Sequence, residues 1–474
     1  MNAALSIATA VLLILVFPRF NLTWLAPLAL APILVACARE LSWKRRFLFG
    51  WAAGIVYWWG VCYWIQFVLQ DHGGLGFALS WVSFILFTIL KGLHMALFAT
   101  LVGFVMGKPW AMPTAAALWA GLERTHGPLG FAWLDLGNAA INMPVAMRLA
   151  PVIGVYGISF VFALIGGAVA LIVLRRPRLE LAGLAILLPL LLLPAVPPPT
   201  AGTETARVVQ PNVDTEADFT QQSVADLSRQ MADLSHVSGI PLIVWPEWPA
   251  PFEMNANFKA YVAQIAFDSH AYFVFNGVAR TAQGEPLNSA YLVNPEGAIV
   301  DRYDQITLVP FGEYVPEPFG WVNRITKETS DFVPGNRVVV FPMGTHKFSV
   351  FICYESAFPN LVRQFVRDGA ELLLNLSNDG YFAHTAAHEQ HLNLARMRAA
   401  ENHRWILRAT NDGITAMIDP AGRVTQRLPS YRQIAADMQY RYLQQTTFYT
   451  RHGDWFAWGC LIAGCVIALL TALL

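Results

Sequence analysis

The thiol of Cys353 is the first candidate for chemistry in this chain. It is the only cysteine between residues 203 and 450, and it ends a strand-like apolar run that begins at Lys347. A carboxylate, Glu355, follows two positions later. A cysteine becomes an attacking group when a neighbouring base takes its proton. Cys353 is therefore a candidate nucleophile, and the alternative is a small buried apolar side chain.

Two other carboxylates lie in apolar surroundings that could suit them to catalysis. Glu247 follows the apolar run Leu242–Trp245, and Glu313 lies in the apolar loop Leu308–Pro316. At the rim of a buried sheet, loss of water raises the pKa of Glu247 and suits it to act as a general base. The Gly and two prolines around Glu313 instead indicate a shaped pocket wall. The alternative for both residues is an ordinary position in an exposed turn.

Strand-like and helix-like segments alternate around these residues. This alternation, with turns between some short strands, predicts layered sheets with helices outside, an α/β fold. The predicted helices span about 218–238, 255–270, 357–368 and 386–402. The predicted strands are Ala206–Val213, Pro241–Glu247, Tyr272–Arg280, Ser289–Asn294, Ala298–Tyr303, Phe348–Tyr354, Leu372–Asn378, Trp405–Asn411 and Ile414–Ile418.

The composition indicates that a membrane part accompanies this α/β domain. The chain of 474 residues is 55% hydrophobic and only 14% charged, whereas about a quarter of the residues of a soluble protein are charged. A bilayer-crossing helix needs about 20 apolar residues. We therefore predict about eight spans, near 3–18, 22–38, 47–69, 77–106, 109–124, 152–174, 180–197 and 454–474.

Basic residues predict the orientation of these spans. Arg39 and Lys44–Arg46 lie between the second and third spans, and Arg175–Arg178 lies between the sixth and seventh. The positive-inside rule places both clusters in the cytoplasm. We therefore predict an N-terminal membrane domain over 1–200, an outward-facing domain over 203–450, and a final span over 454–474. The net charge of zero gives no footprint for nucleic acid.

Several motifs resemble the carbon–nitrogen hydrolase (nitrilase) superfamily, whose catalytic triad is Glu-Lys-Cys on an αββα sandwich. Together with the spans, they are similar to the apolipoprotein N-acyltransferase family. The resemblance covers essentially the whole chain. The matching strings are Val209–Asn212, Trp245–Glu247, Leu308–Pro316, Cys353–Glu355, Gln390-His391, Arg396–Arg398, Thr410–Gly413, and Trp119, Glu123, Arg124 and Gly130–Leu134 in the membrane part.

The resemblance implies a role for each of these residues. Glu247 is expected to be the general base and Cys353 the nucleophile, with Glu313 and Glu355 as supporting carboxylates. The expected substrate-binding residues are Trp133, Trp248, Tyr354 and Tyr381. No cofactor and no metal is expected.

The implied reaction has two membrane-held substrates. Cys353 takes an acyl chain from a phospholipid as a thioester, and the N-terminal α-amine of a diacylglyceryl-modified apolipoprotein then receives the chain as an amide. The resemblance places such an enzyme as a multi-pass protein in the bacterial cytoplasmic (inner) membrane, with its catalytic domain facing the periplasm.

The sequence departs from the family pattern at the catalytic lysine. Gln305 lies eight residues before Glu313, where the family has that lysine, and Thr307 occupies the position of a family histidine. A glutamine can donate a hydrogen bond to an oxyanion but brings no positive charge. Losing one oxyanion donor costs about 2.7–4 kcal/mol, or roughly 10²–10³ in rate. We therefore expect a weakened donor at this position and reduced activity.

Two other functions stay open. The first is a catalytically weak or inactive relative that binds lipoprotein or lipid. The second is a membrane-anchored amidase or nitrilase acting on a small soluble substrate, which a single span would suffice to anchor.

Four further ionisable side chains remain to be placed. Lys91 and His94 share a face of one predicted span and could meet a phospholipid head group, or Lys91 could reach the membrane surface. His388 and His391 have a spacing that suggests a metal, but a zinc site needs further ligands.

Overall fold

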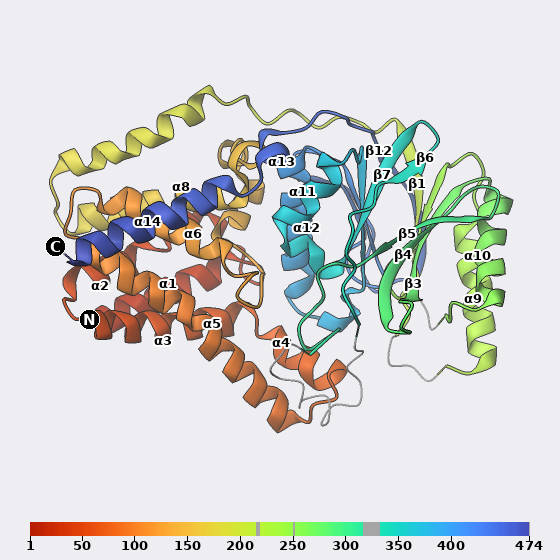
Figure 1. Cartoon of the computed structure of the whole chain (residues 1–474), viewed down its shortest axis with the longest axis horizontal. Helices are drawn as coiled ribbons and strands as arrows, with labels where there is room; N and C mark the ends of the chain where they lie inside the picture. The colour runs from red at the N-terminus through yellow and green to blue at the C-terminus, as the bar shows by residue number, and fades with distance from the viewer. Residues whose placement is uncertain (215–218, 250–251, 316–331, 474) are drawn as a thin grey trace.

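The computed structural model describes residues 1–214, 219–249, 252–315 and 332–473. Apolar helices from both ends of the chain lie on one side of the molecule, and two β-sheets with their helices lie on the other (Figure 1). We call the first the helical part (residues 1–192 and 455–473) and the second the sandwich (residues 204–440). The two parts meet along one side of the sandwich.

The first sheet of the sandwich has the strand order β12-β1-β2-β3-β4-β5. β1, β2 and β3 run parallel, and the strands outside them are antiparallel. The registers align Val208 with Val244 and Val244 with Val274. The strands are β1 Glu204–Gln210, β2 Leu242–Val244, β3 Tyr272–Arg280, β4 Pro286–Val293, β5 Ile299–Asp304 and β12 Ile434–Tyr440.

The second sheet repeats this pattern with the order β11-β10-β9-β8-β7-β6. β7, β8 and β9 are parallel, and β6, β10 and β11 pair antiparallel. The register aligns Phe351 with Asn375 and Asn375 with Arg408. The strands are β6 Phe341–Met343, β7 His346–Ile352, β8 Leu372–Ser377, β9 Ile406–Thr410, β10 Ala416–Ile418 and β11 Val424–Arg427.

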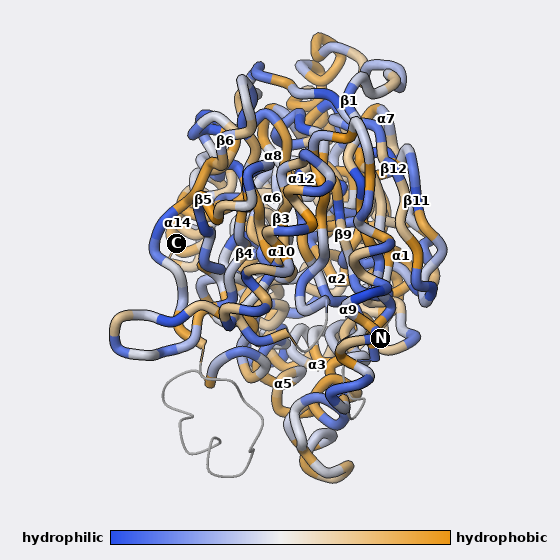
Figure 2. Tube along the Cα trace, turned by 90° about the vertical axis from the view of Figure 1, so that its right-hand side faces the viewer, coloured by the Kyte–Doolittle hydropathy of each residue, from blue (hydrophilic) through white to orange (hydrophobic). Residues whose placement is uncertain are grey.

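Helices cover the outer faces of both sheets. Helices α9 (Gln221–Ser235) and α10 (Ala256–Ser269) pack on the first sheet through Met231 and Val262. Helices α11 (Pro359–Arg367) and α12 (Ala387–Asn402) cover the second sheet and lie between it and the helical part (Figure 1). Apolar side chains of both sheets join in one core, and hydrophilic segments connect the apolar stretches (Figure 2).

These elements confirm the predicted α/β layering. All four predicted helices of the sandwich form, and all nine predicted strands are present with ends shifted by a few residues. The strand prediction missed β6, β11 and β12. β11 and β12 are half-exposed and rich in polar residues, so they lack the continuous apolar run that identifies a buried strand.

The helical part contains fewer long helices than predicted. Three helices among the described residues are long and apolar enough to cross a membrane, Phe77–Val105, Ala150–Val173 and Trp455–Leu473. The count is up to four if the pair Trp43–Val61 and Trp64–His72, bent by 62°, forms one span. The helices of this part are α1 Asn2–Val16, α2 Ala31–Arg39, α3 Trp43–Val61, α4 Trp64–Phe67, α5 Phe77–Val105, α6 Ala111–Arg124, α7 Pro144–Met147, α8 Ala150–Val173 and α14 Trp455–Leu473.

The remaining predicted spans are short or irregular. Apolar segments 3–18 and 109–124 form α1 and α6, of 15 and 14 residues. Segment 22–38 is divided between the 3-10 helix Thr23–Leu28 and α2. Segment 180–197 lies largely in a 3-10 helix, Arg178–Leu192, which buries none of its residues (Figure 1).

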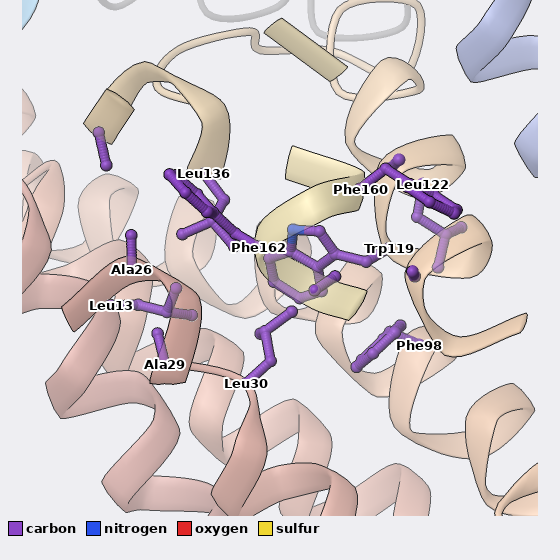
Figure 3. Packing of buried hydrophobic residues seen from close by; sticks show 14 of the residues in the cluster. Leu13, Ala26, Ala29, Leu30, Phe98, Trp119, Leu122, Leu136, Phe160 and Phe162 are labelled. Carbon is purple, nitrogen blue, oxygen red and sulfur yellow. The ribbon is translucent and has the colours of Figure 1, made fainter. Parts of the chain in front are cut away.

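Small residues allow close packing in the helical part. A Cβ atom at Gly54 of α3 would lie 2.7 Å from the backbone of Gly92 in α5, so these two helices touch backbone to backbone, as small residues permit in membranes. Larger side chains fill the remaining space, and Phe98, Trp119 and Phe162 lie in one buried cluster (Figure 3).

Candidate active site

Cys353 lies where β7 ends and a short 3-10 helix, Cys353–Ala357, begins. Its φ of 46° is left-handed, which is uncommon for a residue other than glycine. Such strained backbone at a strand-to-helix turn occurs where a nucleophile is held out from a sheet. The residue as a whole is only partly buried.

Glu247 approaches Cys353 from the opposite sheet. It follows β2 and is 3% exposed. Its carboxylate accepts hydrogen bonds from Asn288 Nδ2 at 2.8 Å and from the backbone N–H of Asn378 at 3.0 Å, and the Cys353 thiol is also within hydrogen-bond reach. Burial, with the neighbouring Glu313 charge, raises the pKa of Glu247 to about 8. The arrangement can pass a proton from sulfur to carboxylate.

Asn288 of β4 links the carboxylates behind Glu247. Its Nδ2 lies 2.8 Å from Glu247 Oε1, 3.0 Å from Glu313 Oε1 and 2.7 Å from Gln305 Oε1. Asn276 Nδ2 of β3 donates to Asn288 Oδ1 at 2.7 Å and fixes the amide orientation. Glu247 and Glu313 are therefore held near one nitrogen, and burial raises the pKa of Glu313 as well.

Gln305 is fully buried beside Glu313. Its Nε2 donates to Glu313 Oε2 at 3.0 Å and to the Thr307 carbonyl at 3.1 Å. An amide nitrogen carries two hydrogens, so both are already used inside the protein. In this arrangement the amide fixes Glu313 and the following loop, and the role of Gln305 as a weakened oxyanion donor stays a prediction.

Glu355 holds the start of this loop against the end of β7. Its two oxygens accept hydrogen bonds from the backbone N–H groups of Ile352, Ile306 and Thr307 and from the Tyr303 hydroxyl, at 2.6–3.1 Å. Burial raises the pKa of Glu355 to about 7. Because all of these partners are donors within the protein, Glu355 ties the Gln305 loop to the cysteine turn.

The thiol of Cys353 is held in its neutral form. Burial raises its pKa well above the ordinary value, and the negative charges of Glu247, Glu313 and Asp379 add to this effect. A hydrogen bond with Ser377 acts in the opposite direction. Attack by the sulfur therefore requires that its proton leaves to a nearby base as the new bond forms.

The side chains of the helical part close one flank of the site. The Tyr354 hydroxyl accepts the backbone N–H of Ala132 at 3.0 Å. The Tyr354 ring stacks on Phe131 and Trp133, with centroids 5.6 and 6.4 Å apart. Phe382, at the end of the turn after β8, packs on Trp133 from the other side. This aromatic wall is apolar and suits a hydrocarbon chain.

The four predicted substrate-binding residues have different surroundings. Tyr354 and Trp133 belong to the aromatic wall. Tyr381 is close enough to Glu247 and Cys353 for their charges to raise the pKa of its hydroxyl, after burial, and its ring meets His72 of the helical part at 4.7 Å. Trp248 adjoins Glu247, but its ring packs against Phe332.

Sequence reasoning missed several residues of the site. Asn276 and Asn288 are buried amides in strands made mostly of apolar residues. An amide facing a core must find partners, so a polar residue within an apolar strand was the available signal. Sequence reasoning also missed the buried ion pair of Arg408 and Asp379, in which Arg408 Nη2 lies 2.7 Å from Asp379 Oδ2.

The ionisable residues of α5 point inward. Lys91 Nζ donates to the Phe131 carbonyl at 2.9 Å and lies 4.9 Å from the Trp58 ring centre. His94 packs edge-on against His126. Lys91 is 5% exposed and holds the aromatic wall instead of reaching the membrane surface. In the described ranges, no group of three or more His, Cys, Asp or Glu could hold a metal ion.

Two family models match the chain, one for each part. The model described as Carbon-nitrogen hydrolase matches residues 205–448, and the model described as Apolipoprotein N-acyltransferase N-terminal domain matches residues 9–168. The two-sheet sandwich, with a cysteine turn from one sheet facing a glutamate from the other, defines the class as a carbon–nitrogen hydrolase domain.

Relatives match over nearly the whole chain. The apolipoprotein N-acyltransferase of Geobacter metallireducens is 30% identical, over 98% of this chain and 94% of the relative. That of Azotobacter vinelandii is 32% identical, over 98% and 93%. An amidase from Nesterenkonia sp. AN1 aligns with 50% of this chain and 92% of its own, at 21% identity and a TM-score of 0.39. The chain belongs to the apolipoprotein N-acyltransferase family.

Proposed function

We propose that the protein is a phospholipid-dependent N-acyltransferase that completes bacterial lipoproteins. The observation that carries this proposal is the Cys353 thiol within hydrogen-bond reach of the Glu247 carboxylate. Both lie beside an aromatic wall to which the helical part contributes Phe131 and Trp133. A hydrolase acting on a small soluble substrate has no need for this wall. An acyl chain delivered from a bilayer requires an apolar surface of this kind.

In the first step, Cys353 takes an acyl chain from a phospholipid. Its Sγ attacks the ester carbonyl carbon while Glu247 accepts the thiol proton. The tetrahedral intermediate then collapses, the carbon–oxygen ester bond breaks, and Glu247 returns the proton to the leaving alkoxide. The products are a thioester on Cys353 and a lysophospholipid, so Glu247 acts as base and then as acid.

In the second step, the acyl chain passes to the acceptor. The N-terminal α-amine of a diacylglyceryl-modified apolipoprotein attacks the thioester carbon, and Glu247 accepts a proton from nitrogen. The carbon–sulfur bond breaks, the sulfur regains a proton from Glu247, and the chain is held as an amide. Exclusion of water by the aromatic wall favours the amine over hydrolysis.

The supporting residues have separate tasks in this proposal. Glu313 and Gln305, joined through Asn288, set the charge around Glu247. Glu355 fixes the turn that presents the sulfur. Tyr354, Trp133 and Tyr381 line the path of the acyl chain, while Trp248 contributes to acceptor binding at the rim.

The proposed membrane arrangement follows the domain limits 1–200, 203–450 and 454–474. About eight apolar segments embed the helical part in the inner membrane, some of them crossing only as short or bent helices. Support comes from apolar side chains exposed along α5 and the 3-10 helix that follows α8, including Leu90, Leu97, Leu188 and Leu192. The basic segments lie on the cytoplasmic side, which leaves the catalytic domain in the periplasm.

The test is to trap the thioester. Purified protein is incubated with a phospholipid carrying a tagged acyl chain, and the adduct on Cys353 is identified by mass spectrometry and by its cleavage with hydroxylamine. Cys353→Ala should abolish the label, and Glu247→Gln should lower it at least about 100-fold. An unlabelled wild-type protein under conditions that label a verified relative would refute the proposal.

A further inference from the structure

Two neighbouring residues of α12, Gln390 and His391, reach in different directions. Gln390 contacts the helical part, and His391 contacts the turn that carries the nucleophile. Both are buried, at 1% and 0% exposure. In this dipeptide, a side chain that contacts the helical part is adjacent in the chain to one that contacts the backbone of Cys353.

His391 binds the backbone of the nucleophile itself. Its Nε2 lies 2.9 Å from the carbonyl oxygen of Cys353. A carbonyl oxygen can only accept, so Nε2 carries the hydrogen and donates it. The bond acts on the one peptide group that follows the left-handed Cys353 backbone. Such strained backbone persists only where its surroundings hold it in place.

The second ring nitrogen of His391, Nδ1, contacts a buried ion pair. Nδ1 accepts a hydrogen bond from Arg408 Nη2 at 3.1 Å. The same Nη2 lies 2.7 Å from both oxygens of Asp379, whose Oδ1 is 3.0 Å from Nδ1. Although burial alone would raise it, Arg408 and His391 keep the pKa of Asp379 well below its usual value. The Arg408–Asp379 pair therefore sets the ring plane and aims Nε2 at Cys353.

Gln390 satisfies every hydrogen-bonding group of its amide at the helical part. Its Oε1 accepts from the indole nitrogens of Trp133 and Trp64 at 2.8 and 3.1 Å. Its Nε2 donates to the backbone carbonyls of Pro18 and Val61 at 2.7 and 3.1 Å. These four partners come from four segments of the helical part, so the amide fits only when they are assembled.

Trp133 joins the two contacts. Its indole nitrogen binds Gln390, and its ring packs on the His391 ring with centroids 5.6 Å apart. The helical part therefore contacts His391 directly through the Trp133 ring, and indirectly through Gln390. Any shift of Trp133 is passed to the imidazole and from there to the carbonyl of Cys353.

We propose that His391 is a positioning residue for Cys353, and that Gln390 makes this positioning depend on docking between the sandwich and the helical part. The inference rests on the proposed function, because it concerns how the same cysteine is aligned for acyl capture. The consequence is that Cys353 is properly aligned only in a chain whose helical part is assembled around Trp64 and Trp133.

The first test compares three replacements of His391 in the full-length protein. His391→Gln keeps an N–H near the position of Nε2, His391→Asn keeps a shorter donor, and His391→Leu removes it. The matched control is His384→Gln, because His384 is exposed just before α12 and its ring contacts Tyr431. Thermal unfolding in detergent shows whether each variant folds.

Two rates are measured for each variant, thioester formation from a tagged-acyl phospholipid and alkylation of Cys353 by iodoacetamide. Loss of one buried hydrogen bond should slow both by about tenfold in the Leu variant. The Gln variant should recover most of the rate, the Asn variant less, and the phospholipid concentration for half-maximal rate should not change. The control should behave as wild type.

The second test removes the docking contact and leaves His391 in place. Gln390→Glu replaces both donors to Pro18 and Val61 with a carboxylate oxygen, and Gln364→Glu on α11, whose amide bonds only its own helix, is the control. We expect slower alkylation of Cys353 in the first variant alone. Equal alkylation in all folded His391 and Gln390 variants would overturn the inference. If the alkylation rates differ between variants as expected but no lipid thioester forms, the proposed function is refuted and the positioning role of His391 stands.

Discussion

Gln305→Lys should accelerate acyl capture in a way that depends on pH. Glu247 has a pKa raised to about 8 by burial and by the Glu313 charge, so at pH 7 roughly one molecule in ten carries the ionised base. The Gln305 amide nitrogen lies 3.0 Å from Glu313 Oε2. A lysine introduced there places a cation beside the carboxylate pair, which lowers such a pKa by about 1–3 units.

The expected gain follows from the fraction of ionised Glu247. Nearly complete ionisation at pH 7 should raise the rate of thioester formation by about tenfold, and the gain should vanish above about pH 9, where Glu247 is already ionised in the wild type. If the introduced ammonium also reaches the oxyanion, a further factor of roughly 10²–10³ applies at every pH. The two contributions are separable because only the first changes with pH.

The assay is single-turnover labelling of Cys353 from a tagged-acyl phospholipid, measured between pH 6 and about pH 9.5. Gln305→Met is the control, because it fills similar volume without charge or donor and should be slower than wild type. The reasoning fails if the ratio of the lysine variant to wild type is flat and near one across this range. It also fails if the methionine variant is accelerated to the same extent.

Two further changes probe the same site from other directions. Glu313→Gln removes the like charge beside Glu247 while keeping the bond to Asn288, so the pH at which thioester formation rises should move to lower values, as a pH–rate profile would show. In the wild type, the free energy of unfolding should fall as pH rises from about 4.5 to about 8, because the folded state retains a proton on Glu247 that the unfolded chain releases. Urea unfolding at several pH values should show this decrease, and the decrease should be smaller in Glu313→Gln. Lys91→Met removes the hydrogen bond to the Phe131 carbonyl and the contact with the Trp58 ring, and should slow thioester formation by about 3- to 10-fold. The control is Lys108→Met, on the loop after α5. An unchanged rate in Lys91→Met would show that Lys91 does not support the aromatic wall.

The sandwich could be predicted from the sequence because its strands are apolar runs bounded by turns. Cys353 and Glu247 each end such a run, and the carboxyl ends of parallel strands gather at one edge of a sheet. Local patterns therefore indicated which residues lie at the rim. They could not indicate that the rims of two separate sheets face each other, because that depends on how the sheets pack.

The supporting residues were harder to predict because their signal is not periodic. Asn288 is a single amide in an apolar strand, and its importance depends on three partners from other elements. Gln390 looks like an ordinary polar helix residue until the helical part surrounds it. The irregular helices among the predicted spans were missed for a related reason, since hydropathy reports apolar length and not whether the backbone stays α-helical, as the 3-10 segment Arg178–Leu192 demonstrates.

The neutral state of Cys353 has a chemical benefit in the location that we propose. Thiolates, rather than thiols, are the form that oxidants and stray electrophiles attack, and the periplasm is an oxidising compartment. Burial and the surrounding carboxylates keep the thiol pKa high, so the resting sulfur is protected. Reactivity then depends on a carbonyl carbon arriving at the sulfur, at the moment when Glu247 can accept the proton. The carboxylate charges around Cys353, which Gln305 does not neutralise as a lysine would, slow the reaction. They also favour a nucleophile that reacts only with a bound acyl group.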